Sequence, residues 1–277
     1  MSDSPSSVLG IIAGKGNYPR LMLQEARRQG RRRIVMAAFE GETDQALAAE
    51  ADQVEWMRVG QLGKLLSFFK NAEVSEAVMA GQITPGRLFD LRPDWKALRL
   101  LLSLKRRNAE SLFGAVADVL ENEGVCLLPA TTYLDKYLAG LGLIAGPRRD
   151  GQLKWDLETA WPVVIQLSAL DVGQCAVVKK GTVLAVEGYD GTNATIRRGG
   201  KLARGGATLC KLSKPNQDMR FDVPVIGLNT LEVCYEAGIK RIIVEAGMTL
   251  ILDLEDVRRF CQDHRITLWG HSERKPI

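Results

Sequence analysis

The sequence predicts an α/β protein of two domains: an N-terminal Rossmann-like domain with a parallel sheet, and a second, mixed α/β domain. The chain has 277 residues, enough for two domains of moderate size. Short apolar runs alternate with amphipathic helix patterns through the first half, whereas the second half contains a hairpin pattern. A stretch rich in Gly, Pro and charge, residues 140–151, separates the halves. We therefore expect domains at 1–145 and 146–277.

The first half alternates strands with helices, which implies right-handed crossovers and a parallel sheet. The first strand ends at a Gly-containing turn, and Pro19 suits the first turn of the helix that follows. The expected strands are 8–13, 33–39, 54–59 and 77–80. The expected helices are 19–30, 62–71, 95–104 and 109–123, the last closed by Gly124.

The second half differs because its first two strands bracket Lys179-Lys180-Gly181, which predicts a hairpin. The expected strands are 175–178, 183–187, 208–212, 223–226, 241–245 and 266–269. The expected helices are 160–174, 230–237 and 253–264.

Composition excludes several classes of protein. Hydrophobic residues make up 46% and charged residues 25%, which excludes a disordered, collagen-like or coiled-coil chain. The net charge of +4 is spread over both halves, so neither half is a nucleic-acid-binding arm and no nucleic-acid partner is expected. No run reaches the about 18 apolar residues of a membrane-spanning helix, and the polar start lacks a signal-peptide pattern. We expect a cytosolic protein.

Cysteine and histidine usage restricts the chemistry. The five cysteines lie far apart and form no C-x-x-C motif, so we expect reduced core thiols. His264 and His271 are the only histidines, which argues against a His-rich metal site and against a Ser-His-Asp triad. Any metal must therefore be held mainly by carboxylates, which favours Mg²⁺ or Mn²⁺ over Zn²⁺.

A Gly-rich turn, Gly14-Lys15-Gly16-Asn17, follows the first predicted strand. Such a turn at a helix N-terminus presents backbone N–H groups to an anion, which indicates a phosphate site; an ordinary βα turn is the alternative. Pro19 stands where the dinucleotide motif G-x-G-x-x-G has its third glycine, so the match is incomplete. Glu40 could imitate the ribose-binding acid of a dinucleotide fold.

Two more Gly-containing turns follow predicted strands, Gly60-Gln61 and Gly81-Gln82-Ile83. Loops at the carboxyl ends of parallel strands line the ligand crevice of an open α/β sheet. We therefore expect these turns and residues 14–17 to form one floor for a polar ligand, unless they are ordinary turns.

A basic, Leu-rich segment covers residues 95–107. Leucines mixed with cations suit an anionic membrane surface or the wall of an apolar pocket. The helical spacing favours a core helix with a solvated basic end.

The densest group of chemistry-bearing residues lies in the second half. Its members are Glu187, Asp190, Gly191 and Thr192 in one stretch and Lys214, Gln217, Asp218, Arg220 and Asp222 in another. Carboxylates can hold Mg²⁺, and Lys and Arg can neutralise phosphate oxygens. Asp218, Arg220 and Asp222 have the i, i+2 spacing of a strand, so we expect them on one side. The alternative is an exposed strand edge with alternating charges. Glu245, at the end of another strand, adds a carboxylate.

These segments occur in order in one known family. The sequence resembles the UDP-2,3-diacylglucosamine pyrophosphatases of lipid A synthesis in their non-calcineurin form. The segments that carry the resemblance are LGIIAGKG (9–16), VGQ (59–61), GQI (81–83), LDVGQ (170–174), LAVEGYDGT (184–192) and KPNQDMRFDVP (214–224). They span nearly the whole chain, and the last two are long and specific.

The resemblance implies a two-domain enzyme that hydrolyses UDP-2,3-diacylglucosamine to 2,3-diacylglucosamine 1-phosphate (lipid X) and UMP. It implies Mg²⁺ dependence, with Mn²⁺ as a substitute, and attack of water at the α-phosphorus. It also implies a Gram-negative cytoplasm, with a lipid substrate drawn from the inner membrane and peripheral contact with the cytoplasmic face of that membrane.

Carried over residue by residue, the resemblance assigns Asp222 as an essential metal-linked acid. It extends catalytic roles to Asp218, Arg220 and Lys214, and it places Glu187 and Asp218 beside Asp222 at the metal. The expected substrate-binding residues are Gly14, Lys15, Gly16, Asn17, Gly60, Gln61, Gly81, Gln82, Ile83, Asp190, Gly191, Thr192 and Gln217.

Two other function classes stay open from the residues alone. A nicotinamide-dependent oxidoreductase would use Gly14-Lys15-Gly16 and Glu40 as its nucleotide site. A non-catalytic nucleotide- or lipid-binding module would bind its ligand equally well with or without metal and would release no UMP.

Overall fold

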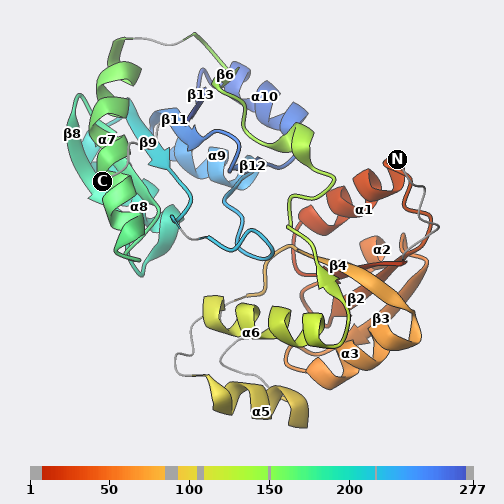
Figure 1. The fold of residues 1–277 in the computed structure, drawn as a ribbon. Helices are drawn as coiled ribbons and strands as arrows, with labels where there is room; N and C mark the ends of the chain where they lie inside the picture. Colours follow the sequence, from red (N-terminus) through yellow and green to blue (C-terminus); the bar gives the residue numbers. More distant parts are fainter. Residues whose placement is uncertain (1–7, 85–92, 105–108, 149–150, 216, 273–277) are drawn as a thin grey trace. The chain divides into compact units, whose positions relative to one another are not determined.

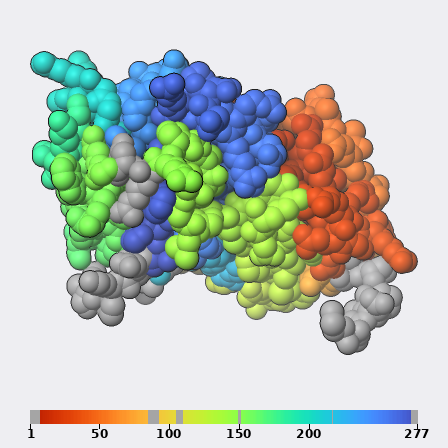
Figure 2. All heavy atoms as spheres, turned by 90° about the horizontal axis from the view of Figure 1, so that it is seen from above, coloured from red at the N-terminus to blue at the C-terminus, as the bar shows by residue number. Residues whose placement is uncertain are grey.

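The computed structural model describes residues 8–84, 93–104, 109–148, 151–215 and 217–272. The chain forms two compact units (Figure 1). The N-terminal unit comprises Met1–Leu134 together with Asp218–Asp222, and the C-terminal unit comprises Asp135–Gln217 together with Val223–Ile277. In the space-filling view of Figure 2 the first part of the chain, coloured red to orange, packs as one contiguous body.

The N-terminal unit contains a parallel sheet of the order β3-β2-β1-β4-β5, which confirms the predicted Rossmann-like class. The strands are β1 (Val8–Ala13), β2 (Ile34–Phe39), β3 (Gln53–Met57), β4 (Val74–Ala80) and β5 (Cys126–Leu127). β1 lies between β2 and β4 and is buried along its whole length, as expected for the central strand of a sheet covered on both faces.

Helices cover both faces of this sheet. They are α1 (Tyr18–Arg28), α2 (Gln45–Ala48), α3 (Leu62–Asn71), α5 (Trp95–Ser103) and α6 (Ala109–Asn122). Figure 1 shows α1 and α3 on opposite faces. Side chains of α3, α5 and α6 share one hydrophobic core with β1, β2 and β4. The amphipathic pattern of α3 predicted this, because Leu62, Leu65, Leu66 and Phe69 are all buried.

The C-terminal unit contains a six-stranded mixed sheet of the order β6-β13-β11-β9-β7-β8, which confirms the predicted mixed α/β class. β9, β11 and β13 are parallel, and β6, β7 and β8 join antiparallel, β7 and β8 through the predicted hairpin. These strands are β6 (Gly142–Ala145), β7 (Cys175–Lys179), β8 (Thr182–Val186), β9 (Ala207–Lys211), β11 (Ile239–Glu245) and β13 (Thr267–His271). β10 (Val225–Ile226) and β12 (Leu250–Ile251) form a separate two-stranded parallel pair.

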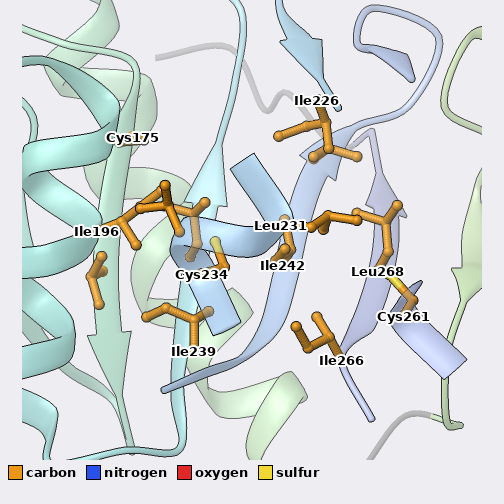
Figure 3. Close-up of a cluster of buried hydrophobic side chains, with 14 of the residues drawn as sticks. Cys175, Ile196, Ile226, Leu231, Cys234, Ile239, Ile242, Cys261, Ile266 and Leu268 are labelled. Atoms are coloured by element: carbon orange, nitrogen blue, oxygen red, sulfur yellow. The ribbon is translucent and has the colours of Figure 1, made fainter. Parts of the chain in front are cut away.

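Alternate side chains of this sheet enter two different cores. Val178 belongs to a core under α7, whereas Val177 belongs to a core under α8, α9 and α10. The helices are α7 (Gly151–Ala169), α8 (Gly191–Ala203), α9 (Leu228–Glu236) and α10 (Leu254–Asp263), and a 3₁₀ turn spans Asp135–Tyr137. Figure 3 shows the second core, to which Ile196 of α8, Leu231 of α9 and Leu268 of β13 contribute.

The two units divide earlier than the predicted boundary between residues 145 and 146. The division falls after Leu134 because β6 pairs antiparallel with β13 and so belongs to the second sheet. The Gly residues that flank β6 made this stretch resemble a linker in the sequence. The chain also returns to the N-terminal unit at Asp218–Asp222, which no local pattern indicates.

The helix α8 is not among the helices that the sequence predicted. Its glycines and Thr192 disfavour a helix in isolation. Gly199 is needed for packing, because a Cβ at this position would lie 2.4 Å from the Cβ of Val177 on β7. The helix is therefore stabilised by close contact with the sheet rather than by its own propensity.

The helix predicted at 160–174 begins and ends earlier, at Gly151 and Ala169. Its first turns carry a buried Asp156, whose carboxylate accepts hydrogen bonds from the Gly181 N–H and the Thr208 hydroxyl. Asp171, beyond its end, has a φ of 55° and so cannot continue the helix.

Four of the five cysteines match the expectation of core thiols. Burial raises the pKa of the Cys261 thiol to about 12 and also raises the pKa values of Cys175, Cys210 and Cys234. Neutral thiols are poor nucleophiles and metal ligands. Cys126, on β5, is exposed instead of buried.

None of the helices in the described ranges combines the length and the apolar composition that crossing a bilayer requires.

Candidate functional site

The carboxyl edge of the N-terminal sheet holds two of the predicted loops in direct contact. The Gly14 N–H donates to the Ala80 carbonyl at 2.8 Å. Lys15 and Gln82 exchange backbone hydrogen bonds in both directions, at 2.7 and 3.1 Å. The loop after β1 and the loop after β4 are therefore joined where the strand order reverses, the place where open α/β sheets bind ligands.

The glycines in these loops are required by this contact. A Cβ at Gly14 would lie 2.5 Å from the Gln82 carbonyl oxygen, and a Cβ at Gly81, whose φ is +92°, would lie 2.8 Å from the Lys15 carbonyl oxygen. The amides of Gly14 and Lys15 are already donated within the protein. Of the predicted anion loop, the exposed part is Lys15, Gly16 and Asn17, so a ligand would meet the loop there.

The third loop of this edge is the one after β2, which the sequence analysis did not identify. Thr43 donates its hydroxyl to the Ala13 carbonyl and accepts the Phe39 N–H. Glu42, 6% exposed, accepts from both the backbone N–H and the hydroxyl of Thr84. Glu42 and Thr43 closely follow a buried strand, and this position could have indicated them. Of this loop, only Glu40 was predicted from the sequence.

The Gly60-Gln61 turn does not join these loops. It follows β3, the edge strand, so that β2 stands between it and β1. The Gly60 carbonyl accepts the Asp94 N–H, and the Gln61 side chain accepts the Arg58 N–H. Ile83, in the loop after β4, is half-buried. The structure therefore brings the loops at 14–17 and 81–83 together, as expected. The third loop beside them is 39–43 and not the expected turn at 60–61.

The segment Asp218–Asp222 is anchored on α6 of the N-terminal unit. The Phe221 ring lies 6.0 Å from the Phe113 ring and packs on the core of that unit. The Met219 carbonyl accepts the Ala130 N–H at 2.7 Å. In Figure 1 the loop passes beside α6. The expected strand is wrong here: Asp222 donates its N–H to the Asp218 carbonyl, which closes a turn and removes the i, i+2 alignment.

Arg220 clamps this turn. Its guanidinium contacts both oxygens of the Asp218 carboxylate, with Nη2 at 2.7 Å, and Nη1 lies 2.6 Å from Glu121 of α6. The hydrogen bonds from Arg220 hold the pKa of Asp218 below its usual value, and Asp218 raises the pKa of Arg220 in return. Both side chains are therefore charged, and they already neutralise each other.

Asp222 differs from Asp218 in being available. It is half-buried, and within the described residues no hydrogen bond or ion pair engages its carboxylate. The turn that the Phe221 and Arg220 contacts hold in place fixes its backbone. A carboxylate on a fixed backbone without a protein partner is suited to a ligand, a metal ion or a water molecule.

The C-terminal unit holds the other predicted residues around the start of α8. The Glu187 carboxylate accepts the Gln174 N–H at 2.8 Å and the Thr192 hydroxyl at 2.7 Å, and Asp190 pairs with Arg198. Gly191, the first residue of α8, has a φ of +79°. The hydrogen bonds to Glu187 thus join the predicted 170–174 and 184–192 segments into one loop pair at a helix N-terminus.

Lys214 and Gln217 lie at the end of β9 in the same unit. Lys214 Nζ lies 2.5 Å from the Asp171 carboxylate, and the Lys214 N–H donates to the Gln217 side chain. The Gln217 Nε2 is buried with no acceptor among the described residues. Nearby, the buried Glu245 accepts both the N–H and the hydroxyl of Ser213, so this carboxylate is used inside the fold.

The expected metal ligands are divided between the units. Asp218 and Asp222 belong to the N-terminal unit and Glu187 to the C-terminal unit. Asp218 and Glu187 are engaged by Arg220 and Thr192. In the described part of the chain, no three His, Cys, Asp or Glu side chains form a group that could hold a metal by themselves. Mg²⁺ commonly takes one or two carboxylates together with substrate phosphates and water, so Asp222 alone fits that mode.

Fold and site together define a two-unit α/β protein with a Rossmann-like N-terminal unit. Residues 8–137 match the LpxI N-terminal domain and residues 141–269 match the LpxI C-terminal domain. The chain is 30% identical over 276 residues to the UDP-2,3-diacylglucosamine pyrophosphatase LpxI of Caulobacter vibrioides, covering 95% of this chain and 96% of that protein. The chain belongs to the LpxI family, as the sequence resemblance indicated.

A solved structure gives a much weaker similarity. The biotin carboxylase domain of Hydrogenobacter thermophilus 2-oxoglutarate carboxylase aligns with a TM-score of 0.26 and 13% identity. The alignment covers 63% of this chain and 35% of the solved chain, which is about a third of its length. A TM-score this low supports no argument about fold or function.

The ion pair of Asp218 with Arg220 predicts a pH-dependent stability. Asp218→Asn should lower the free energy of unfolding by about 1 kcal/mol at pH 7, since the pair is partly exposed. Because the folded pKa is depressed, the difference between parent and variant should be complete above the ordinary Asp pKa and vanish as pH falls through the lowered one. Urea unfolding followed by circular dichroism at a series of pH values measures it. Asp256→Asn, at an exposed pair on α10, is the control; a difference for Asp218→Asn that is independent of pH would contradict the assignment.

Proposed function

We propose that this protein hydrolyses the pyrophosphate bond of UDP-2,3-diacylglucosamine and releases 2,3-diacylglucosamine 1-phosphate (lipid X) and UMP. Membership of the LpxI family and the name of the Caulobacter relative support the substrate. The observation that supports the chemistry is Asp222, which lies on an anchored turn and whose carboxylate no residue of the described ranges engages. The oxidoreductase alternative loses its main support, because the contact with Gln82 accounts for Gly14.

In the proposed reaction water attacks the α-phosphorus of the UDP moiety. A bond forms from the water oxygen to this phosphorus, and the bond from the phosphorus to the bridging oxygen breaks. The electron pair of the broken bond stays on the bridging oxygen, which leaves as part of the 1-phosphate of lipid X. The attacking water gives up a proton, which passes to Asp222 where this carboxylate orients the water, or to solvent where Asp222 holds the metal ion. The developing charge on the leaving phosphate requires cationic neutralisation.

We further propose Mg²⁺ as the cofactor, with Mn²⁺ as a substitute. Of the three carboxylates, Asp222 is best placed to hold the ion. Arg220 already neutralises Asp218, and Glu187 accepts a hydrogen bond from Thr192. When bound, the ion supplies positive charge to the phosphate oxygens. In this proposal Arg220 and Asp218 position Asp222, and Lys214 supplies positive charge to the substrate.

The residues proposed to bind the substrate lie on two groups of loops. Lys15, Gly16 and Asn17, exposed at the sheet edge beside Gln82, suit a phosphate group of the substrate. Asp190, Gly191 and Thr192 offer a second turn at the start of α8. The substrate-binding residues of the sequence analysis therefore remain a proposal, divided between two loop groups.

The first prediction from this proposal concerns Asp222 and the metal. Asp222→Asn should retain binding of UDP-2,3-diacylglucosamine while UMP release falls by at least about 100-fold, because the lost group acts in the transition state. Chelation of divalent ions should stop the parent enzyme, and Mg²⁺ or Mn²⁺ should restore the parent but not the variant. Equilibrium binding and UMP release measure the two effects.

Asp263→Asn, at an exposed position of α10, is the matched control and should behave as the parent. Turnover near the parent level in Asp222→Asn would refute the assignment of the acid. Full turnover in excess chelator would remove the metal from the mechanism.

The lipid chains of the substrate suggest a role for α5. Only Ala97 of this helix is buried, while Trp95 and Leu102 are each 69% exposed and Leu98 is 36% exposed. These three share one helix face, and the Arg99 guanidinium lies 5.7 Å from the Trp95 ring. The helix thus places Ala97 and Leu100 against the core, as its spacing favoured, and leaves its opposite face exposed. Residues 105–107, the basic end of that segment, lie outside the described residues. We propose that this face touches lipid at the cytoplasmic surface of the inner membrane.

This surface gives a second prediction. The double variant Leu98→Gln, Leu102→Gln should reduce binding to vesicles that contain phosphatidylglycerol, and should reduce turnover of the long-chain substrate more than turnover of a short-chain analogue. Vesicle co-sedimentation and UMP release measure the two effects. Leu170→Gln, at a 72% exposed leucine of the C-terminal unit, is the control. Equal losses on both substrates together with a lower melting temperature would show a purely structural helix.

A further inference from the structure

A pocket of about 590 Å³ opens beside the end of β2 in the N-terminal unit. Its apolar wall contains Ala48 from the end of α2 and Val54 and Trp56 from β3. Val54 and Trp56 are two residues apart on an edge strand, so both side chains point to the same face. The polar part of the pocket contains Glu40, Thr43 and Gln45. The proposed function assigns no role to any of these residues.

The pocket adjoins the loops of the candidate site. Thr43 lines the pocket, and its hydroxyl donates to the carbonyl of Ala13, the residue directly before Gly14. The same side chain accepts the Phe39 N–H at the end of β2. Thr43 is therefore the residue that connects a ligand in the pocket to the start of the Gly14–Asn17 turn.

The composition of the pocket selects a neutral ligand with a flat apolar part. None of the described residues that line it is Lys or Arg, so it is unsuited to a phosphate group. An indole beside small aliphatic side chains suits a planar ring. Glu40 can accept hydrogen bonds from hydroxyl groups, and in sheets of this strand order an acid after the second strand binds ribose hydroxyls.

We propose that this pocket binds the nucleoside of the substrate, with the pyrimidine ring against Trp56 and the ribose hydroxyls on Glu40. The phosphates then extend past Thr43 toward Gly16 and Asn17, the exposed part of the Gly-rich turn. This inference rests on the proposed function, since it names the place where the uridine part of the same substrate binds. It also gives a role to Glu40, which the sequence analysis linked only to a dinucleotide.

The test is equilibrium binding of UMP and of 2′-deoxy-UMP to the full-length protein. Trp56→Leu should weaken UMP binding about tenfold, because stacking on the ring is lost. Glu40→Gln should remove the preference for UMP over 2′-deoxy-UMP, an effect that a merely structural role would not produce. Trp155→Leu, at an exposed tryptophan of α7, is the matched control and should bind as the parent.

Two results would overturn the inference. The first leaves the proposed function intact, whereas the second refutes the proposed function as well. If the parent releases UMP from the substrate but Trp56→Leu and Glu40→Gln bind both nucleotides as the parent does, the pocket assignment fails and the proposed function stands. If the parent neither binds nor releases UMP, both fail. Glu40 is exposed, so Glu40→Gln keeps the test decisive even if Trp56→Leu does not fold.

Discussion

The docking of Phe221 and Arg220 on α6 is the interaction on which the site depends. Residues 218–222 come late in the chain, yet the Phe113–Phe221 ring contact and the Arg220–Glu121 ion pair make them part of the N-terminal unit. Aromatic packing supplies most of the anchoring free energy, since a partly exposed ion pair contributes little. The contacts also use Asp218 to hold Arg220, whereas the Asp222 carboxylate has no hydrogen bond or ion pair with the residues that the structure describes.

A second constraint acts on the edge of the N-terminal sheet. The turns after β1, β2 and β4 are tied to one another by Lys15 with Gln82, Thr43 with Ala13, and Glu42 with Thr84. Backbone contact at Gly14 leaves no room for a Cβ. Loops that are joined in this way are ordered before a ligand arrives, so little conformational entropy is lost on binding. The glycines thus act mainly on loop geometry, and the exposed Lys15–Asn17 turn faces solvent.

The sequence predicted the fold class and most strands because hydrophobic periodicity is a local signal. It did not predict α8, since Gly199 and Gly200 are unfavourable in an isolated helix and fit only against β7 and Ala237. Spacing suggested a strand at 218–222, but the half-buried Phe221 packs on Phe113 of α6, far earlier in the sequence. The proposed role of Asp222 as the acid came from the family resemblance and not from residue spacing. The positions of Glu42, Thr43 and the pocket beside Trp56 are set by contacts between segments that lie far apart in the sequence. Such contacts leave no pattern in a single sequence.

Hydrolysis in ¹⁸O-labelled water tests the central claim, that this protein cleaves the pyrophosphate of UDP-2,3-diacylglucosamine by attack of water at the α-phosphorus. The reaction joins the water oxygen to that phosphorus, so mass spectrometry of the products after a single turnover should find the label in UMP and none in lipid X. Label in lipid X would place the attack at the β-phosphorus and contradict the mechanism. Failure to form either product would contradict the function itself.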